Sequence, residues 1–139
     1  MKNLIILLFL IQGIAYGKSP YAVVQEFIDV AEKTKSSEHC PKLLKEHKNI
    51  KNLDFAFEKC VYSAAHHSKD KKQCDILETF YPTSKVPHSW PNSYGSCLAM
   101  VATETADKDL CNGYPDNVKA ACLSMKKNMR PGFFQLTCR

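Results

Sequence analysis

Residues 60–74 read CVYSAAHHSKDKKQC and residues 97–111 read CLAMVATETADKDLC, and the two stretches share one pattern. Thirteen residues separate the two cysteines in each stretch. Each stretch also has an alanine five positions after its first cysteine (Ala65, Ala102) and an aspartate four positions before its second (Asp70, Asp107). A pattern that recurs at a fixed period indicates a repeated structural unit. The chain is therefore predicted to be an array of similar units.

Two incomplete copies of the pattern flank these stretches. The copy from Glu26 to Cys40 keeps the alanine, as Ala31, but has glutamate where the first cysteine would stand. The copy from Cys122 to Cys138 is two residues longer and lacks the alanine. Terminal units of repeat proteins commonly depart from the pattern because they have a neighbour on one side only. We expect these copies to be the two ends of the array.

The first 17 residues are predicted to be a secretory signal peptide. Lys2 supplies the positive start, residues 4–14 form an apolar run with two interruptions, and residues 15–17 offer small residues for cleavage. The run is shorter than the roughly 20 residues that a membrane helix needs. No later stretch is apolar enough to span a membrane. We therefore expect an exported protein, secreted or periplasmic, whose mature chain begins near Lys18.

Export determines how the seven cysteines are interpreted, because an oxidising compartment favours disulfides over free thiols. No Cys-x-x-Cys pair of the kind found in zinc sites is present, so no metal or other cofactor is predicted. The net charge of +5 is small and its positive residues are scattered, which argues against a nucleic-acid partner. By length, residues 18–130 are expected to form one disulfide-linked repeat domain, followed by an irregular tail over residues 131–139.

Apolar residues recur at three- and four-residue steps along the mature chain, which predicts an all-α fold of short antiparallel helical hairpins. No run of strict alternation suggests a strand. Prolines 82, 87 and 91 predict a loop over residues 82–91. Side chains expected to cap helix starts are Ser36 or Ser37, Asn52, Asp70, Asp107 and Asp116. The six or seven helices are expected near residues 21–33, 41–48, 52–68, 71–81, 92–105, 107–112 and 116–129.

Two schemes of neighbouring disulfides suit the repeat. The first joins Cys40 to Cys60, Cys74 to Cys97 and Cys111 to Cys122, and leaves Cys138 over. The second joins Cys60 to Cys74, Cys97 to Cys111 and Cys122 to Cys138, and leaves Cys40 over. A bridge needs Cα atoms about 4.4 to 6.8 Å apart. In antiparallel hairpins the cysteines of the first scheme differ in height by about 0 to 5 Å, and those of the second by about 6 to 8 Å. Geometry favours the first scheme without excluding the second.

His66 and His67, with Asp70 nearby, are the most evident candidates for chemistry. Adjacent helical residues point about 100° apart, so the two imidazoles cannot hold one ion from a single face. An exposed helix end is the favoured interpretation, and the lone residues His39, His47 and His88 are likewise expected to face solvent. The chain has no Gly-x-Ser-x-Gly, His-Glu-x-x-His or phosphate-binding glycine motif. No catalytic residue is therefore predicted.

Surface contacts are predicted at two places. Cys138 is left over in the first scheme, and a spare thiol in an exported protein suits a disulfide-linked homodimer. Phe133 and Phe134 precede it and are expected either to contact a second chain or to cover the end of the helical stack. Trp90 and Tyr94 form the second predicted surface, because aromatic side chains often anchor protein contacts.

These features together predict a non-catalytic protein-interaction module with an unidentified protein partner. Small size, disulfides and mild basicity also permit a secreted effector or a toxin-like ligand. Against membrane attack, no predicted helix combines a basic face with a broad apolar one. An enzyme with a dispersed site built on His66, His67 or Asp70 is the third and least favoured alternative.

Overall fold

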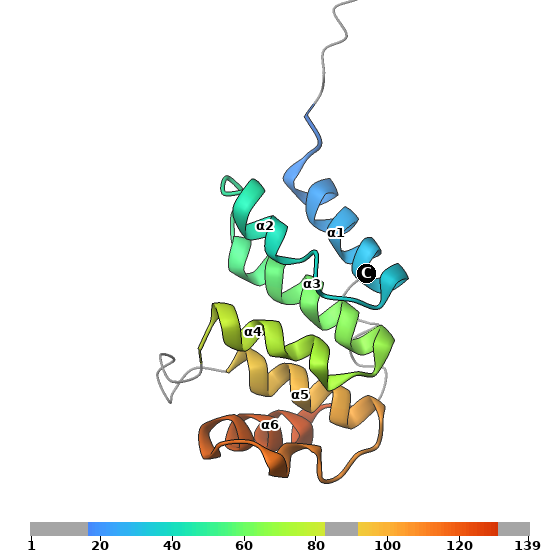
Figure 1. Cartoon of the computed structure of the whole chain (residues 1–139), viewed down its shortest axis with the longest axis vertical. Coiled ribbons are helices and arrows are strands. Elements are labelled where there is room, and N and C mark those ends of the chain that lie inside the picture. The colour runs from blue at the N-terminus through green and yellow to red at the C-terminus, as the bar shows by residue number, and fades with distance from the viewer. Residues whose placement is uncertain (1–16, 83–91, 131–139) are drawn as a thin grey trace, which may run out of the picture.

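The computed structural model describes residues 17–82 and 92–130, and all regular structure in these residues is helical (Figure 1). The predicted all-α class is confirmed. The predicted signal peptide over residues 1–17 lies almost wholly outside the described residues, as do most of the 82–91 loop and the tail from residue 131. In chain order the elements are α1 (Pro20–Thr34), α2 (Pro41–Glu46), α3 (Leu53–Ser68), the 3-10 helix η1 (Lys71–Cys74), α4 (Asp75–Phe80), α5 (Ser93–Glu104), the 3-10 helix η3 (Leu110–Gly113) and α6 (Asp116–Asn128).

Four longer helices, α1, α3, α5 and α6, form the body of the array. Contacts join α1 to α3, α3 to α5 and α5 to α6, so neighbours in the chain are neighbours in space. Figure 1 shows α1 and α2 at one end of the long axis and α6 at the other. Each of the first three long helices is followed by a short segment that contacts the next long helix. These segments are α2, the pair η1 and α4, and η3. The unit of the sequence repeat is therefore a long helix followed by a short one.

Three disulfides join successive units, and they are the bridges of the first predicted scheme. Each ties a cysteine in or directly before a short segment to a cysteine within the next long helix. The Cα atoms are 5.8, 5.8 and 5.7 Å apart, and all six cysteines are fully buried. The bridges are Cys40–Cys60, Cys74–Cys97 and Cys111–Cys122. The second scheme is thereby excluded for these six cysteines.

The repeated alanine belongs to the core of each unit. Ala31 on α1, Ala65 on α3 and Ala102 on α5 are all fully buried. A methyl group at these positions leaves room for the backbone of a neighbouring helix to approach closely. Larger side chains, led by Phe57 and Leu98, fill the remaining space between the helices. The sequence pattern therefore marks packing positions, in addition to bridge positions.

Two of the predicted helix starts agree with the structure. The Asp70 side chain accepts a hydrogen bond from the Lys72 N–H at 2.9 Å, and so caps η1 as predicted. Asp107 Oδ1 accepts bonds from the backbone N–H groups of Asp109 and Leu110, which closes the turn before η3. The segment that follows is a single 3-10 turn over Leu110–Gly113, shorter than the helix predicted there.

Three other predicted caps are wrong. Asn52 has a left-handed backbone, with φ of 57°, and its side chain caps nothing because that geometry turns it away from the N–H groups of α3. Pro115 occupies the cap position of α6, and Asp116 is its first helical residue. Ser37 makes a tertiary contact instead of a cap: its N–H donates to Gln73 Oε1 at 2.8 Å, joining the α1–α2 connection to η1. Ser36 accepts a bond from the Glu38 N–H without capping α2.

Hydrogen bonds also join α3 to the start of α5. The Ser93 hydroxyl donates to Glu58 Oε1, and the Tyr62 hydroxyl donates to the Ser93 carbonyl at 3.0 Å. Burial raises the pKa of Glu58 despite the hydrogen bond from Ser93, which lowers it. These hydrogen bonds join the two units, in addition to the Cys74–Cys97 disulfide between η1 and α5.

Candidate interaction surface

A groove of about 430 Å³ lies between the first turns of α1 and α3, at the α1 end of the array. Val24, Ile28, Ile50 and Ala56 contribute apolar side chains to it, and Ile28, Ile50 and Ala56 are buried in the core beneath. We call this site the α1–α3 groove. Its volume lies within the range of ligand sites, and such sites are mostly lined by apolar groups.

Two aromatic side chains line opposite walls of the α1–α3 groove. Tyr21 in the first turn of α1 is 75% exposed, and Phe55 in the first turn of α3 is 58% exposed. Neither belongs to the face that packs its helix into the array: Phe57 and Cys60 on α3 are fully buried, whereas Phe55 points away from them. Exposed aromatic residues beside an apolar floor are typical anchors of protein contacts.

The charge of the groove has one sign. Its lining includes Lys51 and Lys59 but no aspartate or glutamate. Lys59 Nζ lies 4.9 Å from the centroid of the Phe55 ring, a cation–π distance. Asp54, next to Phe55 in the sequence, accepts a hydrogen bond from the Tyr81 hydroxyl at 2.7 Å and does not line the groove. The groove is therefore apolar at its floor and cationic at its edge.

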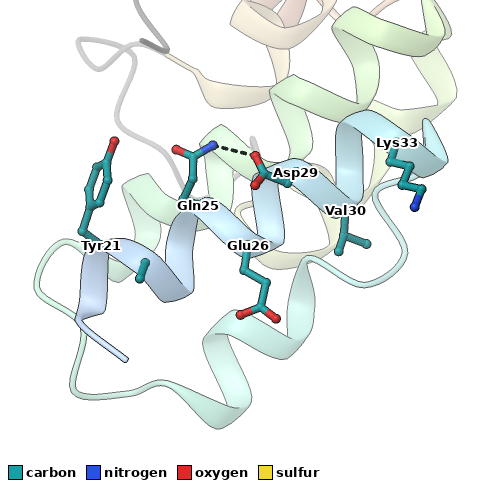
Figure 2. Close-up of a pocket in the computed structure, with 7 residues that line it drawn as sticks. Tyr21, Gln25, Glu26, Asp29, Val30 and Lys33 are labelled. Carbon is teal, nitrogen blue, oxygen red and sulfur yellow. Dashed lines mark hydrogen bonds between the residues drawn. The ribbon is translucent and has the colours of Figure 1, made fainter. Parts of the chain in front are cut away.

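A second hollow, of about 480 Å³, lies on the outer side of α1 (Figure 2). It shares Tyr21 and Gln25 with the α1–α3 groove, and the Gln25 amide donates to Asp29 at 2.8 Å. Glu26, Asp29 and Lys33 line it, so it carries charges of both signs. Its mixed lining provides less basis for selecting a partner than the α1–α3 groove does.

The prediction that Tyr94 belongs to a contact surface is wrong. Trp90, the other residue of that predicted surface, lies outside the described residues. Tyr94 is only 9% exposed, its hydroxyl donates to Asp75 Oδ1 at 2.9 Å, and its ring meets Tyr114 edge to face. It is therefore a core residue that joins α5 to α4. Phe133, Phe134 and Cys138 also lie outside the described residues.

His66 is buried, contrary to the prediction of an exposed helix end. It is 8% exposed on α3, and its Nδ1 lies 3.6 Å from Glu104 Oε1 on α5. His67, by contrast, is exposed, and its Nδ1 lies 3.0 Å from the Ser63 carbonyl oxygen of its own helix. Asp70 caps η1. The His66 and His67 rings meet edge to face with centroids 4.9 Å apart, but one residue is buried and the other exposed, and Asp70 is used as a cap.

Burial lowers the pKa of His66, although nearby Glu104 and Glu32 act in the opposite direction. Folding therefore favours the neutral imidazole, and the free energy of unfolding should fall as the pH drops below about 6.5, the ordinary histidine value. His66→Gln is expected to reduce this loss between about pH 7.5 and 5, measured by urea unfolding. His67→Gln should reduce the loss less than His66→Gln does, because it removes only a neighbouring charge that adds to the lowering of the His66 pKa. An unchanged pH dependence in His66→Gln would contradict the assignment.

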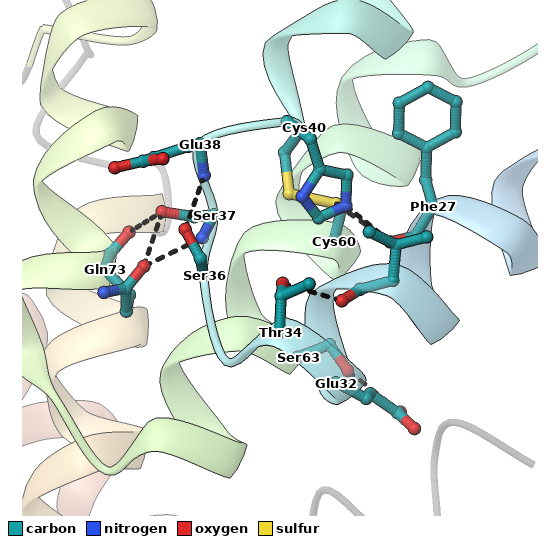
Figure 3. The surroundings of a disulfide bond; sticks show 12 residues. Phe27, Glu32, Thr34, Ser36, Ser37, Glu38, Cys40, Cys60, Ser63 and Gln73 are labelled. Carbon is teal, nitrogen blue, oxygen red and sulfur yellow. Dashed lines mark hydrogen bonds between the residues drawn. A yellow bond between two sulfur atoms is a disulfide. The ribbon is translucent and has the colours of Figure 1, made fainter.

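His39 and His47 also differ from the prediction of solvent exposure. Both are half-buried against Phe27, with ring centroids 5.8 and 5.7 Å from the Phe27 ring. His39 Nε2 lies 2.9 Å from the Phe27 carbonyl oxygen and 3.7 Å from Cys60 Sγ, beside the Cys40–Cys60 bridge (Figure 3). In residues 17–82 and 92–130, His39, Cys40 and Cys60 are the one set of three such donor atoms grouped closely enough for a metal. Both sulfurs are in the bridge, however, and a metal would require thiolates.

The residues that sequence reasoning missed are Tyr21 and Phe55. Phe55 carries a usable signal, because it lies off the helical face defined by Leu53, Phe57 and Cys60. A large apolar side chain on the polar side of an amphipathic helix has no place in that unit's own core. The signal locates an exposed aromatic residue, but it does not show that a second one lies across a groove.

Comparison of the chain with protein-family models, with curated proteins and with solved structures finds no match. Among the helices of the described residues, none combines the length and the apolar character needed to cross a membrane. The α1–α3 groove, with its apolar floor, aromatic walls and positive charge, is therefore the feature that bears on function.

Proposed function

We propose that this protein is a non-catalytic protein-interaction module whose binding site is the α1–α3 groove. The observation that carries the proposal is the pair of exposed aromatic residues, Tyr21 and Phe55, on opposite walls of an apolar floor. Truncating an anchor of this kind to alanine commonly weakens the binding free energy by about 2 kcal/mol or more. The Cys40–Cys60 bridge supports the role, because it ties α3, the helix of one wall, to the segment that follows α1 and so limits the entropic cost of binding.

Export is part of the proposal. Three disulfides within one chain are consistent with an extracellular or otherwise oxidising location. The apolar run of residues 4–14 supports a cleaved signal peptide. Mass analysis of the protein from its native source is expected to find a chain beginning near Lys18.

Photo-crosslinking tests the groove. A benzophenone side chain at position 55, in otherwise native protein added to its source fluid, is expected to give a discrete protein adduct. Excess wild-type protein should compete the adduct away, and a Tyr21→Ala variant should compete poorly. Leu123 on α6 is 42% exposed and provides the matched control position. Equal adducts from positions 55 and 123, or equal competition by wild type and Tyr21→Ala, would remove the groove as the binding site.

The seventh cysteine supports a covalent dimer as an additional property. Six of the seven cysteines are in the three bridges, which leaves Cys138. Wild-type protein is expected to run as a dimer on a non-reducing gel and as a monomer on a reducing gel, whereas Cys138→Ser runs as a monomer on both. A wild-type monomer in both lanes would exclude the dimer and leave the groove proposal untouched.

A further inference from the structure

We infer that the partner of the α1–α3 groove is a short amphipathic helix with an apolar face and acidic flanks. This inference rests on the proposed function and adds the chemistry of the partner to it. Three properties of the groove carry it: the length of its walls, the arrangement of its apolar groups and the sign of its charge.

The length of the walls limits the length of the bound segment. On α1 the lining extends from Pro20 to Ile28, and on α3 from Asn52 to Lys59. Each stretch covers about two helical turns, or about 12 Å. A bound helix therefore makes its contacts over about two turns. A segment of this length presents apolar side chains on one face at positions three or four apart.

The apolar groups suit such a face. Val24 and Ile28 lie one turn apart on α1, and Ala56 on α3 has only a methyl group. The floor therefore has space for a side chain from outside, and Tyr21 and Phe55 can contact that side chain from both sides. Two apolar residues of a partner helix, one turn apart, match this arrangement.

The positive charge of the groove determines which residues are expected to flank the apolar face of the partner helix. Lys51 precedes α3 and Lys59 lies almost two turns along it, so the two lysines stand at the two ends of the α3 wall. The carboxylates nearest to these lysines in sequence have other partners: Asp54 accepts a hydrogen bond from Tyr81, and Glu58 accepts one from Ser93. Within the described residues, neither groove lysine forms an ion pair. Acidic residues seven or eight positions apart on a partner helix would meet both ammonium groups.

Three synthetic peptides of about 14 residues test the inference on the full oxidised protein. The first, acetyl-AAELAALAAAEAAA-amide, has two leucines one turn apart and two glutamates eight positions apart on the same side of the helix. The second has lysine in place of both glutamates. The third has the composition of the first with its leucines on opposite faces. Binding is measured by NMR titration at low salt and at about 0.3 M salt, with signals of residues 20–28 and 50–59 as the readout.

The acidic amphipathic peptide is expected to bind at least about tenfold more tightly than the basic one at low salt. The difference should shrink at higher salt, because exposed charge pairs are screened. Lys51→Glu/Lys59→Glu should reverse the preference. Lys108→Glu/Lys127→Glu makes the same charge change at exposed positions near the α6 end and should preserve it.

The remaining outcomes separate the two proposals. Equal groove binding by the acidic and basic peptides would overturn the acidic partner and retain the groove as a docking site. Binding of the third peptide as tightly as the first would overturn the helical partner. Failure of every peptide to shift the groove signals would overturn the helical partner, whereas the groove itself would fall only if crosslinking from position 55 also failed. Self-association lost in Tyr21→Ala/Phe55→Ala, seen by sedimentation, would replace the partner helix with a second copy of this chain.

Discussion

When the denatured protein is returned to native buffer with its cysteines reduced, it is expected to stay unfolded at room temperature. The three bridges close loops with sequence separations of 20, 23 and 11 residues. The chain-entropy model assigns about 3 kcal/mol to each loop, or about 9 kcal/mol in all. Small domains have a net stability of only about 5 to 15 kcal/mol. Removal of all three constraints therefore leaves little or no stability.

The experiment starts from denaturant, because all six bridged cysteines are buried and shielded from a reductant in the folded state. Dilution into buffer containing a phosphine reductant should give a weak helical circular-dichroism signal and no cooperative thermal transition. Oxidised protein treated in the same way is the control. The variant Cys111→Ser/Cys122→Ser, which lacks one of the three bridges, should lose about 3 kcal/mol of stability and still fold. A cooperative transition in fully reduced protein would show that packing alone holds the array.

Gly95→Ala is expected to destabilise the domain by about 2 kcal/mol, although alanine is the better helix former. A Cβ at position 95 of α5 would lie 2.6 Å from the Ala121 Cβ and 3.1 Å from the Val118 carbonyl oxygen, both on α6. Neither atom can move without its helix. Overpacking of this kind costs about 1 to 3 kcal/mol. Helix propensity returns only about 1 kcal/mol, and the steep contact with Ala121 places the cost at the upper end.

A compensating change distinguishes the clash from other effects of glycine. Ala121→Gly removes the methyl group that the new side chain at position 95 would meet, so the double variant should be about 1 kcal/mol more stable than Gly95→Ala alone, as measured by urea unfolding. Gly113→Ala is the control, since a Cβ there meets no atom within 4 Å, and it should change stability by less than about 0.5 kcal/mol. A Gly95→Ala variant as stable as wild type would refute the close approach of α5 and α6.

Gly95 also shows that helix propensity alone can misjudge a residue. By propensity, a glycine in the first turn of a helix is a weak point. In the structure, the absence of a Cβ at position 95 allows Ala121 and the Val118 carbonyl of α6 to pack against α5. Propensity depends on the residue alone, whereas close approach depends on a second helix more than twenty residues away in the chain.

Much of the fold and little of the candidate site could be predicted from the sequence. Cysteine spacing and helix rise were enough to favour the observed pairing of Cys40 with Cys60 and Cys74 with Cys97, because both depend on distances along the chain. The groove depends instead on which side chains a neighbouring helix leaves uncovered. Tyr94 and Tyr21 are both tyrosines near helix starts, yet one is buried against Asp75 and the other is exposed.

The sequence by itself determined the helical class and the repeat unit, since helical periodicity and cysteine spacing are local properties of the chain, and it favoured the observed bridges without excluding the second scheme. Only the tertiary structure decided that His66 is buried against Glu104, that Tyr94 belongs to the core and that Tyr21 faces Phe55 across a groove. The physical reason is that burial depends on the distance between helices, and this distance is set by the packing of side chains from several units at once.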